Sequence, residues 1–289
     1  MVATSVTHLE PLEMLDAGHR LVGFTQTRYI VSDYFRRRVR NGLLHDVGNE
    51  MMPDAEAILA LHPDALLVFS TGNDRKDFSL YRKAGIPVVY IAEWLETTPL
   101  GRAEWLRVFG ALTGRRKLAD SLFDRICARY EHTRDSIALL LQKRKRPKVF
   151  RGGMFGDKWY MAGGASWAAQ HIRDAGGDYV IRDSTHTGSM AINYENAVAY
   201  LLRSDIWLDP GSWTSKQQIR KDVPQAVRAP FWQAGKIYSV NLKTNSRGQI
   251  IFFERSPMHP DWVLDDLARI FHSDSVSGSS LHFYAPLPD

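Results

Sequence analysis

Short apolar runs alternate with amphipathic stretches over the first 92 residues of the chain. The runs are largely apolar, and they predict strands at 2–6 (VATSV), 20–25 (RLVGFT), 65–70 (ALLVFS) and 87–92 (PVVYIA). The stretches between them predict helices at 11–18, 53–61 and 78–85. Apolar strands separated by helices are typical of a parallel sheet covered on both faces. The first part of the chain is therefore predicted to be an α/β lobe.

A single long helix is predicted from about residue 114 to 143. Apolar side chains recur there at three-, four- and seven-residue steps, and they are Leu118, Leu122, Ile126, Tyr130, Ile137 and Leu141. A helix of this length spans about 40 Å, longer than most helices of globular proteins. Pro147 is expected to stop it, because proline lacks the amide proton that a helix interior needs.

The alternation of strands and helices resumes after Pro147. Strands are predicted at 148–153, 179–183, 205–210 and 236–241, and helices at 166–177, 194–203, 217–230 and 260–272. The last stretch starts as a Ser/Gly linker and ends in an aromatic patch that could dock back onto the protein. The predicted organisation is an N-terminal α/β lobe (1–112), a linking long helix (113–146), a C-terminal α/β lobe (147–272) and a C-terminal tail (273–289).

The composition is that of an ordinary globular protein. The chain has 289 residues, of which 44% are hydrophobic and 24% charged, so it can bury a large core and is not disordered. Its formal charge is +5, with the densest basic runs at 35–40 (FRRRVR) and 142–148 (QKRKRPK). No aromatic-interleaved platform or DNA-binding motif accompanies these runs, so we interpret them as solvated helix faces or helix ends and expect no nucleic-acid partner. The one cysteine, Cys127, excludes an intrachain disulfide.

Neither a membrane span nor a signal peptide is visible. No apolar stretch approaches the roughly 18 residues that a spanning helix needs, and the start MVATSVTH lacks the basic and apolar regions of a secretion signal. Because the first predicted strand begins almost at Met1, we expect that a targeting segment precedes this sequence. The missing signal therefore does not indicate the cytoplasm.

One local pattern occurs twice. PDAEAILALHPDALLVF (53–69) and NYENAVAYLLRSDIWLD (193–209) each read as a short helix, then an aspartate, then an apolar strand. Glu56 and Glu195 stand in the first turn of the two helices. An acidic residue there can be an ordinary partner of the helix dipole. The repetition, once in each predicted lobe, suggests a paired role outside the lobes.

These segments resemble the bacterial substrate-binding proteins of ABC importers that carry ferric siderophores, haem or cobalamin. VGNEMMPDAEAILALHPDALLV (47–68) is similar to the N-terminal Asn-x-Glu and Ile-x-x-Leu-x-Pro-Asp segment of that family. WYMAGGASWAAQHIRDAGG (159–177) is similar to its glycine-flanked strand and helix, and NYENAVAYLLRSDIWL (193–208) to its Ser-x-Glu-x-Val-Leu segment. The resemblance extends over about residues 2 to 272.

The resemblance implies a fold and a role. The fold class is α/β, with two Rossmann-like lobes that have parallel central sheets and are joined by one long α-helix. Cargo would lie in the cleft at the carboxyl ends of the strands. Such a protein is not an enzyme; it is an extracytoplasmic monomer, periplasmic or lipid-anchored, that delivers its cargo to membrane permease subunits. Glu56 and Glu195 match the family's permease-docking glutamates, which pair with arginines.

Ligand contacts are expected from loops that follow strands. A mixture of aromatic side chains and a few cations suits a bulky, flat or anionic iron chelate. Ser5 and Thr25 stand in these loops as well. The predicted ligand-binding residues are Thr7, His8, Arg28, Tyr29, Trp94, Phe155, Trp159, Tyr160, Trp213, Lys243 and Arg247. As an alternative, Trp159 and Tyr160 are strand residues that face the core.

Ferric siderophore is the first cargo to expect, with haem and cobalamin as alternatives. Haem needs an axial ligand, for which the sequence offers His8, Tyr29, Tyr160 and His186. A bare metal ion is not expected, because the ten histidines are scattered without a ligand spacing. No resident cofactor is predicted.

Two other classes of protein compete with this interpretation. A two-lobed α/β chain could be an enzyme such as a nucleotide-sugar transferase. The sequence, however, has no G-x-G-x-x-G or G-x-x-x-x-G-K loop, no G-x-S-x-G elbow and no H-E-x-x-H pair. A cytoplasmic regulatory or scaffold protein is the third alternative, and only the missing signal peptide favours it.

Overall fold

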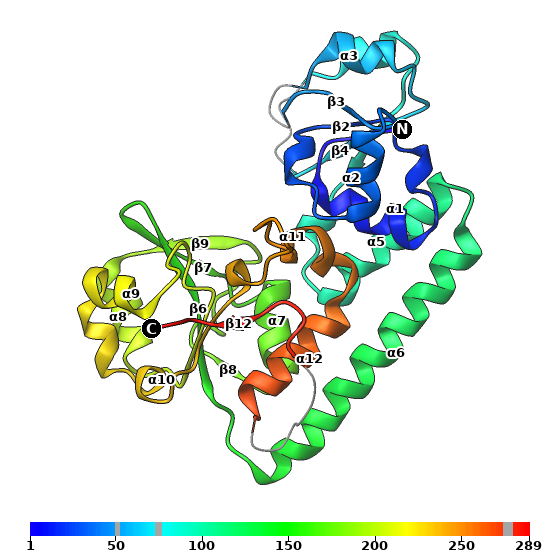
Figure 1. Cartoon of the computed structure of the whole chain (residues 1–289). Helices are drawn as coiled ribbons and strands as arrows, with labels where there is room; N and C mark the ends of the chain where they lie inside the picture. The colour runs from blue at the N-terminus through cyan, green and yellow to red at the C-terminus, as the bar shows by residue number, and fades with distance from the viewer. Residues whose placement is uncertain (50–52, 73–76, 274–279) are drawn as a thin grey trace. The chain divides into compact units, whose positions relative to one another are not determined.

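The chain folds into two compact units, which are described separately. The computed structural model describes residues 1–49, 53–72, 77–273 and 280–289 (Figure 1). Residues 50–52 of the quoted N-terminal motif and 274–279 of the tail therefore lie outside the described residues. The first unit comprises Met1–Glu96, Gly101–Asp124 and Asn245–Met258, and the second comprises Thr97–Leu100, Arg125–Thr244 and His259–Asp289.

The first unit contains the predicted parallel sheet, with five strands where the sequence indicated four. Its strand order is β3-β2-β1-β4-β5, and all four pairings are parallel. Val2 lies in the central strand, in register with Gly23 on one side and Leu66 on the other. The strands are β1 (Val2–Ala3), β2 (Gly23–Phe24), β3 (His45–Asp46), β4 (Leu66–Phe69) and β5 (Val88–Ile91).

Short helices accompany this sheet, and polar side chains cap two of them. The Ser32 hydroxyl accepts from the Phe35 amide at the start of α2, and the Asp54 carboxylate accepts from the Ala57 amide at the start of α3. The basic run at 35–40 lies on α2. The helices are α1 (Leu9–Met14), α2 (Asp33–Arg40), α3 (Ala55–Ala60), α4 (Ser79–Lys83), α5 (Pro99–Leu112) and α11 (Phe252–Arg255). The core contains Val2, Val47, Ile58, Leu66, Val68, Phe78, Tyr81 and Ile86.

The predicted long helix is present as α6 (Arg116–Leu140), of 25 residues. Gly114 adopts a left-handed φ of 69° after α5, so the new helix begins only at Arg116. A 3₁₀ turn at Leu141–Lys143 ends it before Pro147. Residues up to Asp124 belong to the first unit and those from Arg125 to the second. The buried stripe is Ala119, Phe123, Ile126, Tyr130 and Ile137.

The second unit has a sheet that is parallel at its centre and antiparallel at its edges. Its order is β12-β11-β10-β6-β7-β9, and β8 pairs with β6. The pairs among β6, β8, β10 and β11 are parallel, whereas those of β7 with β6, β7 with β9 and β11 with β12 are antiparallel. The strands are β6 (Lys148–Phe155), β7 (Lys158–Ala162), β8 (Asp178–Tyr179), β9 (Ser189–Ile192), β10 (Ile206–Leu208), β11 (Ile237–Ser239) and β12 (Ala285–Pro286).

Two differences from the predicted elements have clear causes. The strand expected at 179–183 is only the two residues of β8, because a turn begins at Val180. The helix expected at 217–230 is broken at Pro224 and Pro230, each of which starts a new helical segment. The helices are α7 (Trp167–Asp174), α8 (Tyr194–Leu201), α9 (Lys216–Asp222), α10 (Pro230–Gln233) and α12 (Pro260–Phe271).

The end of the chain packs onto the second unit. Phe283, Tyr284 and Leu287 are buried, and β12 extends the sheet beside β11. The Asp266 carboxylate of α12 accepts hydrogen bonds from the three consecutive amides of 282–284. The aromatic patch of the predicted tail is thus part of the second unit. Asn245–Met258, which the sequence analysis placed in the C-terminal lobe, belongs to the first.

Candidate functional site

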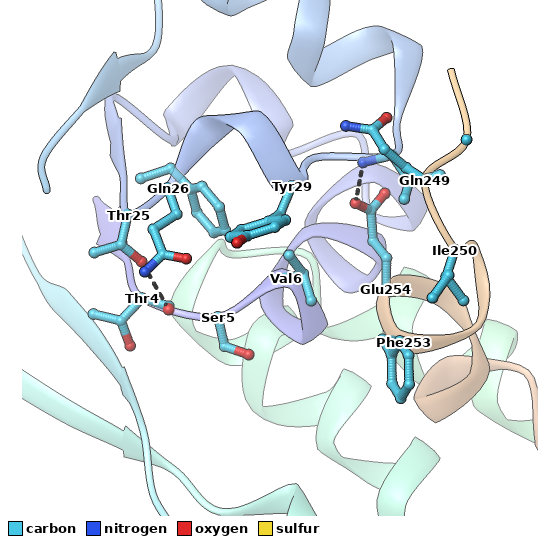
Figure 2. Close-up of a pocket in the computed structure, with 13 residues that line it drawn as sticks. Thr4, Ser5, Val6, Thr25, Gln26, Tyr29, Gln249, Ile250, Phe253 and Glu254 are labelled. Atoms are coloured by element: carbon cyan, nitrogen blue, oxygen red, sulfur yellow. Dashed lines mark hydrogen bonds between the residues drawn. The ribbon is translucent and has the colours of Figure 1, made fainter. Parts of the chain in front are cut away.

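A pocket of about 490 Å³ lies in the first unit, at the carboxyl ends of β1 and β2 (Figure 2). Ligand pockets of open α/β sheets occupy this edge, because the strand ends leave room between the loops that follow them. The pocket is formed jointly by the loops after β1 and β2 and by a segment near the end of the chain. Its lining residues are Thr4, Ser5, Val6, Phe24, Thr25, Gln26, Tyr29, Val31, Gly248, Gln249, Ile250, Phe253 and Glu254.

Two threonines fix the loops that follow the strands. The Thr25 hydroxyl donates to the Thr4 carbonyl at 2.8 Å, and the Thr4 hydroxyl accepts from the Phe69 amide at 3.0 Å. The next residue, Gln26, has a left-handed φ of 52°, which turns the chain sharply after β2. Three neighbouring strand ends are therefore held in fixed positions around the pocket floor.

Tyr29 presents its phenol from the loop after β2. The side chain is 52% exposed and lines the pocket. The Arg28 guanidinium donates to the phenol oxygen at 3.2 Å and lies 4.8 Å from the ring centroid. The Gln249 side-chain amide donates to the Arg28 carbonyl, which connects the late segment to this loop. The pair places an oxygen ligand and a cation together at an accessible surface.

Glu254 is a buried carboxylate in the lining of this pocket. Its two oxygens accept from the Val31 amide at 2.7 Å and the Ser32 amide at 2.9 Å. Burial raises the pKa of Glu254 to about 7, although the two amides and Arg255 oppose the shift; Glu10 adds to it. The side chain therefore changes its charge near neutral pH.

A second pocket, of about 570 Å³, lies in the second unit at the carboxyl ends of β6 and β10. Its lining includes exposed aromatic surface, since Phe155 is 80% and Tyr160 40% exposed. The other lining residues are Gly152, Gly153, Met154, Asp209, Gly211, Ser212 and Asn241. Each unit thus has a pocket at the same end of its parallel strands.

Asp209 is the acidic group of this second pocket, and its position is fixed on several sides. Its carboxylate pairs with the largely buried Arg151 guanidinium at 2.8 Å and accepts from the Val240 amide at 3.3 Å. The Tyr284 hydroxyl of the C-terminal segment donates to it at 3.4 Å. Burial raises the pKa of the Tyr284 phenol, so this group stays a hydrogen-bond donor.

Several predicted ligand residues lie at these pockets. Tyr29 lines the first pocket with Arg28 bonded to it, and Ser5 and Thr25 from the same loops also line it. Phe155 and Tyr160 line the second pocket. No ligand contact is established by position alone, so the binding roles of these residues stay predictions.

Three predicted residues are core side chains instead. His8 and Trp159 have no exposed surface and Trp213 has 7%. Burial lowers the pKa of His8 to about 3, so its imidazole is neutral. Trp159 packs against Trp213 at a centroid distance of 5.8 Å. The side chains of neighbouring strand residues alternate, so Trp159 faces inward where Tyr160 faces outward. A ligand contact by His8 or Trp159 is not supported.

The remaining predicted residues lie outside both pocket linings. Trp94 is 44% exposed with the Arg102 guanidinium 5.5 Å from its ring centroid, and Thr7 is half-buried. Lys243 is half-buried in the second unit, whereas Arg247 is exposed beside the Gly248 and Gln249 of the first pocket. His186, considered as an axial ligand, is exposed in the irregular stretch before β9.

Glu56 and Glu195 occupy matching positions at two helix starts. Glu56 is exposed in the first turn of α3, whose cap is Asp54, and Glu195 is exposed in the first turn of α8, whose cap is Asn193. Each helix precedes a parallel strand of its own unit, β4 or β10. The local pattern read from the sequence is therefore present in both units.

A group of side chains with metal-ligand chemistry occurs at the C-terminal segment. Ligand atoms of Asp265, Asp266 and His282 lie within 4.8 Å of one another, the one such group among the described residues. Asp266, however, uses both oxygens for backbone amides, and Asp265 pairs with Arg269 at 2.9 Å. The group is accounted for by its role in anchoring the end of the chain.

Sequence reasoning missed the late half of the first pocket. Gln249, Ile250, Phe253 and Glu254 lie beyond Lys243 and Arg247, the last residues predicted after the strand at 236–241. They stand more than 200 residues after the loops they complete. The only local signal is the turn sequence Asn245–Gly248, where Gly248 has a φ of 78°. A turn signal does not reveal which distant loop the segment will contact.

Comparison with protein families finds a match over most of the chain. The profile of the periplasmic binding protein family matches residues 1–242. A lipoprotein of Methanocaldococcus jannaschii is 26% identical over 258 residues, which cover 87% of this chain and 59% of that protein. The chain thus spans less than two thirds of the length of this relative. Among the described residues, no helix is both long and apolar enough to cross a membrane.

Solved structures share the fold across 94–100% of the chain. A periplasmic haem-binding protein from Pseudomonas aeruginosa superposes with a TM-score of 0.75 at 18% identity, covering 100% of this chain and 97% of that one. Staphylococcus aureus IsdE complexed with haem superposes with a TM-score of 0.68 at 18% identity, covering 94% of this chain and 98% of that one. The vitamin B12 binding protein BtuF of Vibrio cholerae superposes with a TM-score of 0.63 at 16% identity, covering 96% of this chain and 97% of that one.

Proposed function

Because the chain belongs to the periplasmic binding protein family, we propose that it is the extracytoplasmic, monomeric substrate-binding component of an ABC importer. Its cargo is an iron complex, which it delivers to the permease subunits in the membrane. The family consists of solute-binding proteins, so the chain is not the transferase considered from the sequence. The observation that carries the proposal is the pocket of the first unit, which opens at the strand ends and combines aromatic, amide and hydroxyl groups.

A ferric siderophore is the first cargo that we propose. Tyr29 and Phe253 supply aromatic surface for the organic part of a chelate, while Thr25, Gln26 and Gln249 supply hydrogen bonds. Arg28 and Arg247 are exposed beside this lining and carry the positive charge that an anionic chelate requires. Lys243, predicted from the sequence, is the third cation that we propose as a ligand residue.

The three cations make this cargo testable. Replacing Arg28, Arg247 or Lys243 with alanine is expected to weaken binding of a ferric tris-catecholate about tenfold each, because each change removes a charge-assisted hydrogen bond of roughly 1.5 kcal/mol. Quenching of tryptophan fluorescence measures the affinity. Arg144→Ala, in the exposed basic run after α6, is the matched control and should bind as the wild type does. Unchanged affinity in all three variants removes the case for an anionic chelate.

Haem is the second candidate, and Tyr29 is the specific observation that favours it. A tyrosine oxygen is one of the axial ligands that haem iron takes, and the Arg28 guanidinium at 3.2 Å would balance a negative charge on that oxygen. The fold is shared with structures described as haem-binding and with one described as vitamin B12 binding. Cobalamin remains the third cargo of the same class.

Absorbance spectra separate these cargoes. Purified protein is titrated with haemin, a ferric tris-catecholate and cyanocobalamin, and each produces its own visible band on binding. If haem is the cargo, Tyr29→Phe is expected to change the Soret region and to weaken binding about tenfold, the equivalent of 1.4 kcal/mol. If the cargo is a siderophore, the same variant keeps its affinity within about threefold. A wild-type protein that takes up none of the three contradicts the proposed function.

The partner surface that we propose contains Glu56 and Glu195. Both carboxylates are exposed in a first helical turn, where the helix dipole favours negative charge. An exposed carboxylate presents two oxygens to a guanidinium fork, which suits docking onto arginines of the permease. One such group in each unit would give two anchoring points.

A further inference from the structure

The segment Asn245–Met258 supplies a large part of the first pocket. It belongs to the first unit although it follows Thr244 of the second, and it lies beyond residues 1–242 that the family profile matches. Its helix α11 runs from Phe252 to Arg255. The pocket residues that it contributes are Gly248, Gln249, Ile250, Phe253 and Glu254.

Side chains of this segment hold the backbone of the loop that carries Tyr29. The Asn245 amide donates to the Val31 carbonyl at 3.4 Å, and the Gln249 amide donates to the Arg28 carbonyl. Glu254 accepts from the Val31 amide, which is the dashed bond at its carboxylate in Figure 2, and from the Ser32 amide. The backbone on both sides of Tyr29 is thus bonded to one segment.

Glu254 makes the strongest contacts between this segment and the loop that carries Tyr29. Its side chain is buried, with 1% of the residue exposed, and each oxygen has one amide within 2.9 Å. Hydrogen bonds to a charged acceptor contribute more than those between neutral groups, and a buried amide that loses its acceptor is costly. Rotation of this carboxylate would therefore free the start of α2 and the loop before it.

The charged groups around Glu254 come from two elements, α1 and α11. Glu10 of α1 lies close enough to raise its pKa, and Arg255 of α11 lowers it; these two pair with each other at 3.3 Å. Glu13 of α1 accepts from the Ser32 hydroxyl, on the residue whose amide Glu254 binds. The site therefore holds three carboxylates and one guanidinium.

We propose that Glu254 is the positioning residue of the iron-chelate pocket: by holding Val31 and Ser32 it fixes Arg28 and Tyr29 where they meet the cargo. The proposal rests on the proposed function, because it concerns how the same pocket binds its chelate. Glu254 acts through the loop and not through the iron. The late segment, and not only the strand-end loops, thus determines cargo affinity.

Protonation gives this role a pH signature. The ionised carboxylate accepts from both amides, whereas a protonated carboxyl has one good acceptor and places its own O–H against the second donor. Because the pKa of Glu254 is raised to about 7, the side chain is mainly ionised at pH 8 and mainly protonated at pH 6. Chelate affinity is therefore expected to fall as the pH decreases from 8 to 6.

Glu254→Gln tests the proposal, with haemin and a ferric tris-catecholate as the probes. Glutamine keeps the shape but supplies one acceptor and one donor, so the affinity at pH 8 is expected to fall about tenfold. The wild type should lose affinity between pH 8 and 6, whereas the variant should change little, so that the two converge at pH 6. The control Glu104→Gln, at an exposed residue of α5, should retain the wild-type affinity and pH profile.

Gln249→Ala gives a second variant in case Glu254→Gln does not fold. It removes the bond to the Arg28 carbonyl and should weaken binding about threefold with the wild-type pH profile kept. The positioning role is overturned if the wild type binds a chelate and both variants keep its affinity and its pH profile. The proposed function would still stand in that case. A wild-type protein that binds neither probe at any pH removes the proposed function, and this proposal falls with it.

Discussion

Replacing Asp266 with alanine is expected to destabilise the second unit by about 4 kcal/mol, a large fraction of the roughly 5–15 kcal/mol that stabilises an ordinary domain. Asp266 is fully buried and accepts from the His282 amide at 2.7 Å, the Phe283 amide at 2.7 Å and the Tyr284 amide at 3.2 Å. Alanine would leave these three amides without their acceptor. Each hydrogen bond to a charged group contributes roughly 1.5 kcal/mol or more. The loss of all three therefore costs more stability than most single substitutions do.

The destabilisation should extend beyond the loss of the three hydrogen bonds. Phe283 and Tyr284 are buried, and β12 follows directly after them on the edge of β11. Releasing the segment would expose both aromatic side chains and free the Tyr284 hydroxyl from Asp209 in the second pocket. The variant is therefore expected to lose cargo affinity as well as stability, because the pocket acid loses one of its partners.

Denaturant unfolding followed by circular dichroism measures the change, and Asp265→Ala is the control. Asp265 is the neighbouring carboxylate on α12 and pairs with Arg269 at 2.9 Å, with 28% of its side chain exposed. A pair of this kind contributes less than about 1 kcal/mol. Equal unfolding free energies for the two variants would show that the buried carboxylate does not anchor the end of the chain.

The strands that the sequence predicted correctly are those with apolar residues on both faces. β4 and β10 are such strands, and both lie inside parallel sheets where helices cover each side. β9 was missed because it is antiparallel and carries exposed residues on one face; Ser189–Ile192 alternates between exposed and half-buried positions. A four-residue strand of that kind has no local pattern that separates it from a loop.

The long helix was predicted because its apolar stripe repeats over seven turns. Ile126, Tyr130 and Ile137 are buried as the spacing required. Its start was placed two residues early, since Gly114 lies in the left-handed turn between α5 and α6. Element boundaries depend on cap conformations, which a stripe of apolar residues does not contain.

The candidate site was only half visible in the sequence. Loops after strands could be identified, so Thr25 and Tyr29 were found from their position alone. The facing half comes from Asn245–Met258, which returns to the first unit after Arg125–Thr244 of the second unit and before His259–Asp289. Likewise, the alternation of side chains along a strand predicts that Trp159 and Tyr160 face opposite sides of the sheet. It does not predict which of them faces the core. Long-range packing decides both questions.

Reversing the charge of Glu56 and Glu195 together is expected to abolish stimulation of the cognate transporter's ATPase while cargo affinity stays unchanged. Both carboxylates are exposed, and within the described part of the chain neither has a hydrogen-bond or ion-pair partner. Neither lines a pocket described above. A lysine at each position would face permease arginines, where like charges repel. The cost to each helix start is only about 0.5 kcal/mol, so the fold should persist.

The measurement compares ATP hydrolysis by the reconstituted transporter with cargo-loaded wild type, each single reversal and the double reversal. The single variants should retain part of the stimulation, because one anchor remains. The control Glu104→Lys with Asp183→Lys changes the net charge by the same amount, again with one exposed residue in each unit, and should stimulate as the wild type does. Stimulation that survives the Glu56 and Glu195 double reversal contradicts docking through these residues. If cargo affinity collapses in that variant, the two glutamates instead belong to the fold or to a pocket. Residues that only dock onto the permease do not contact the chelate, so they cannot change its affinity.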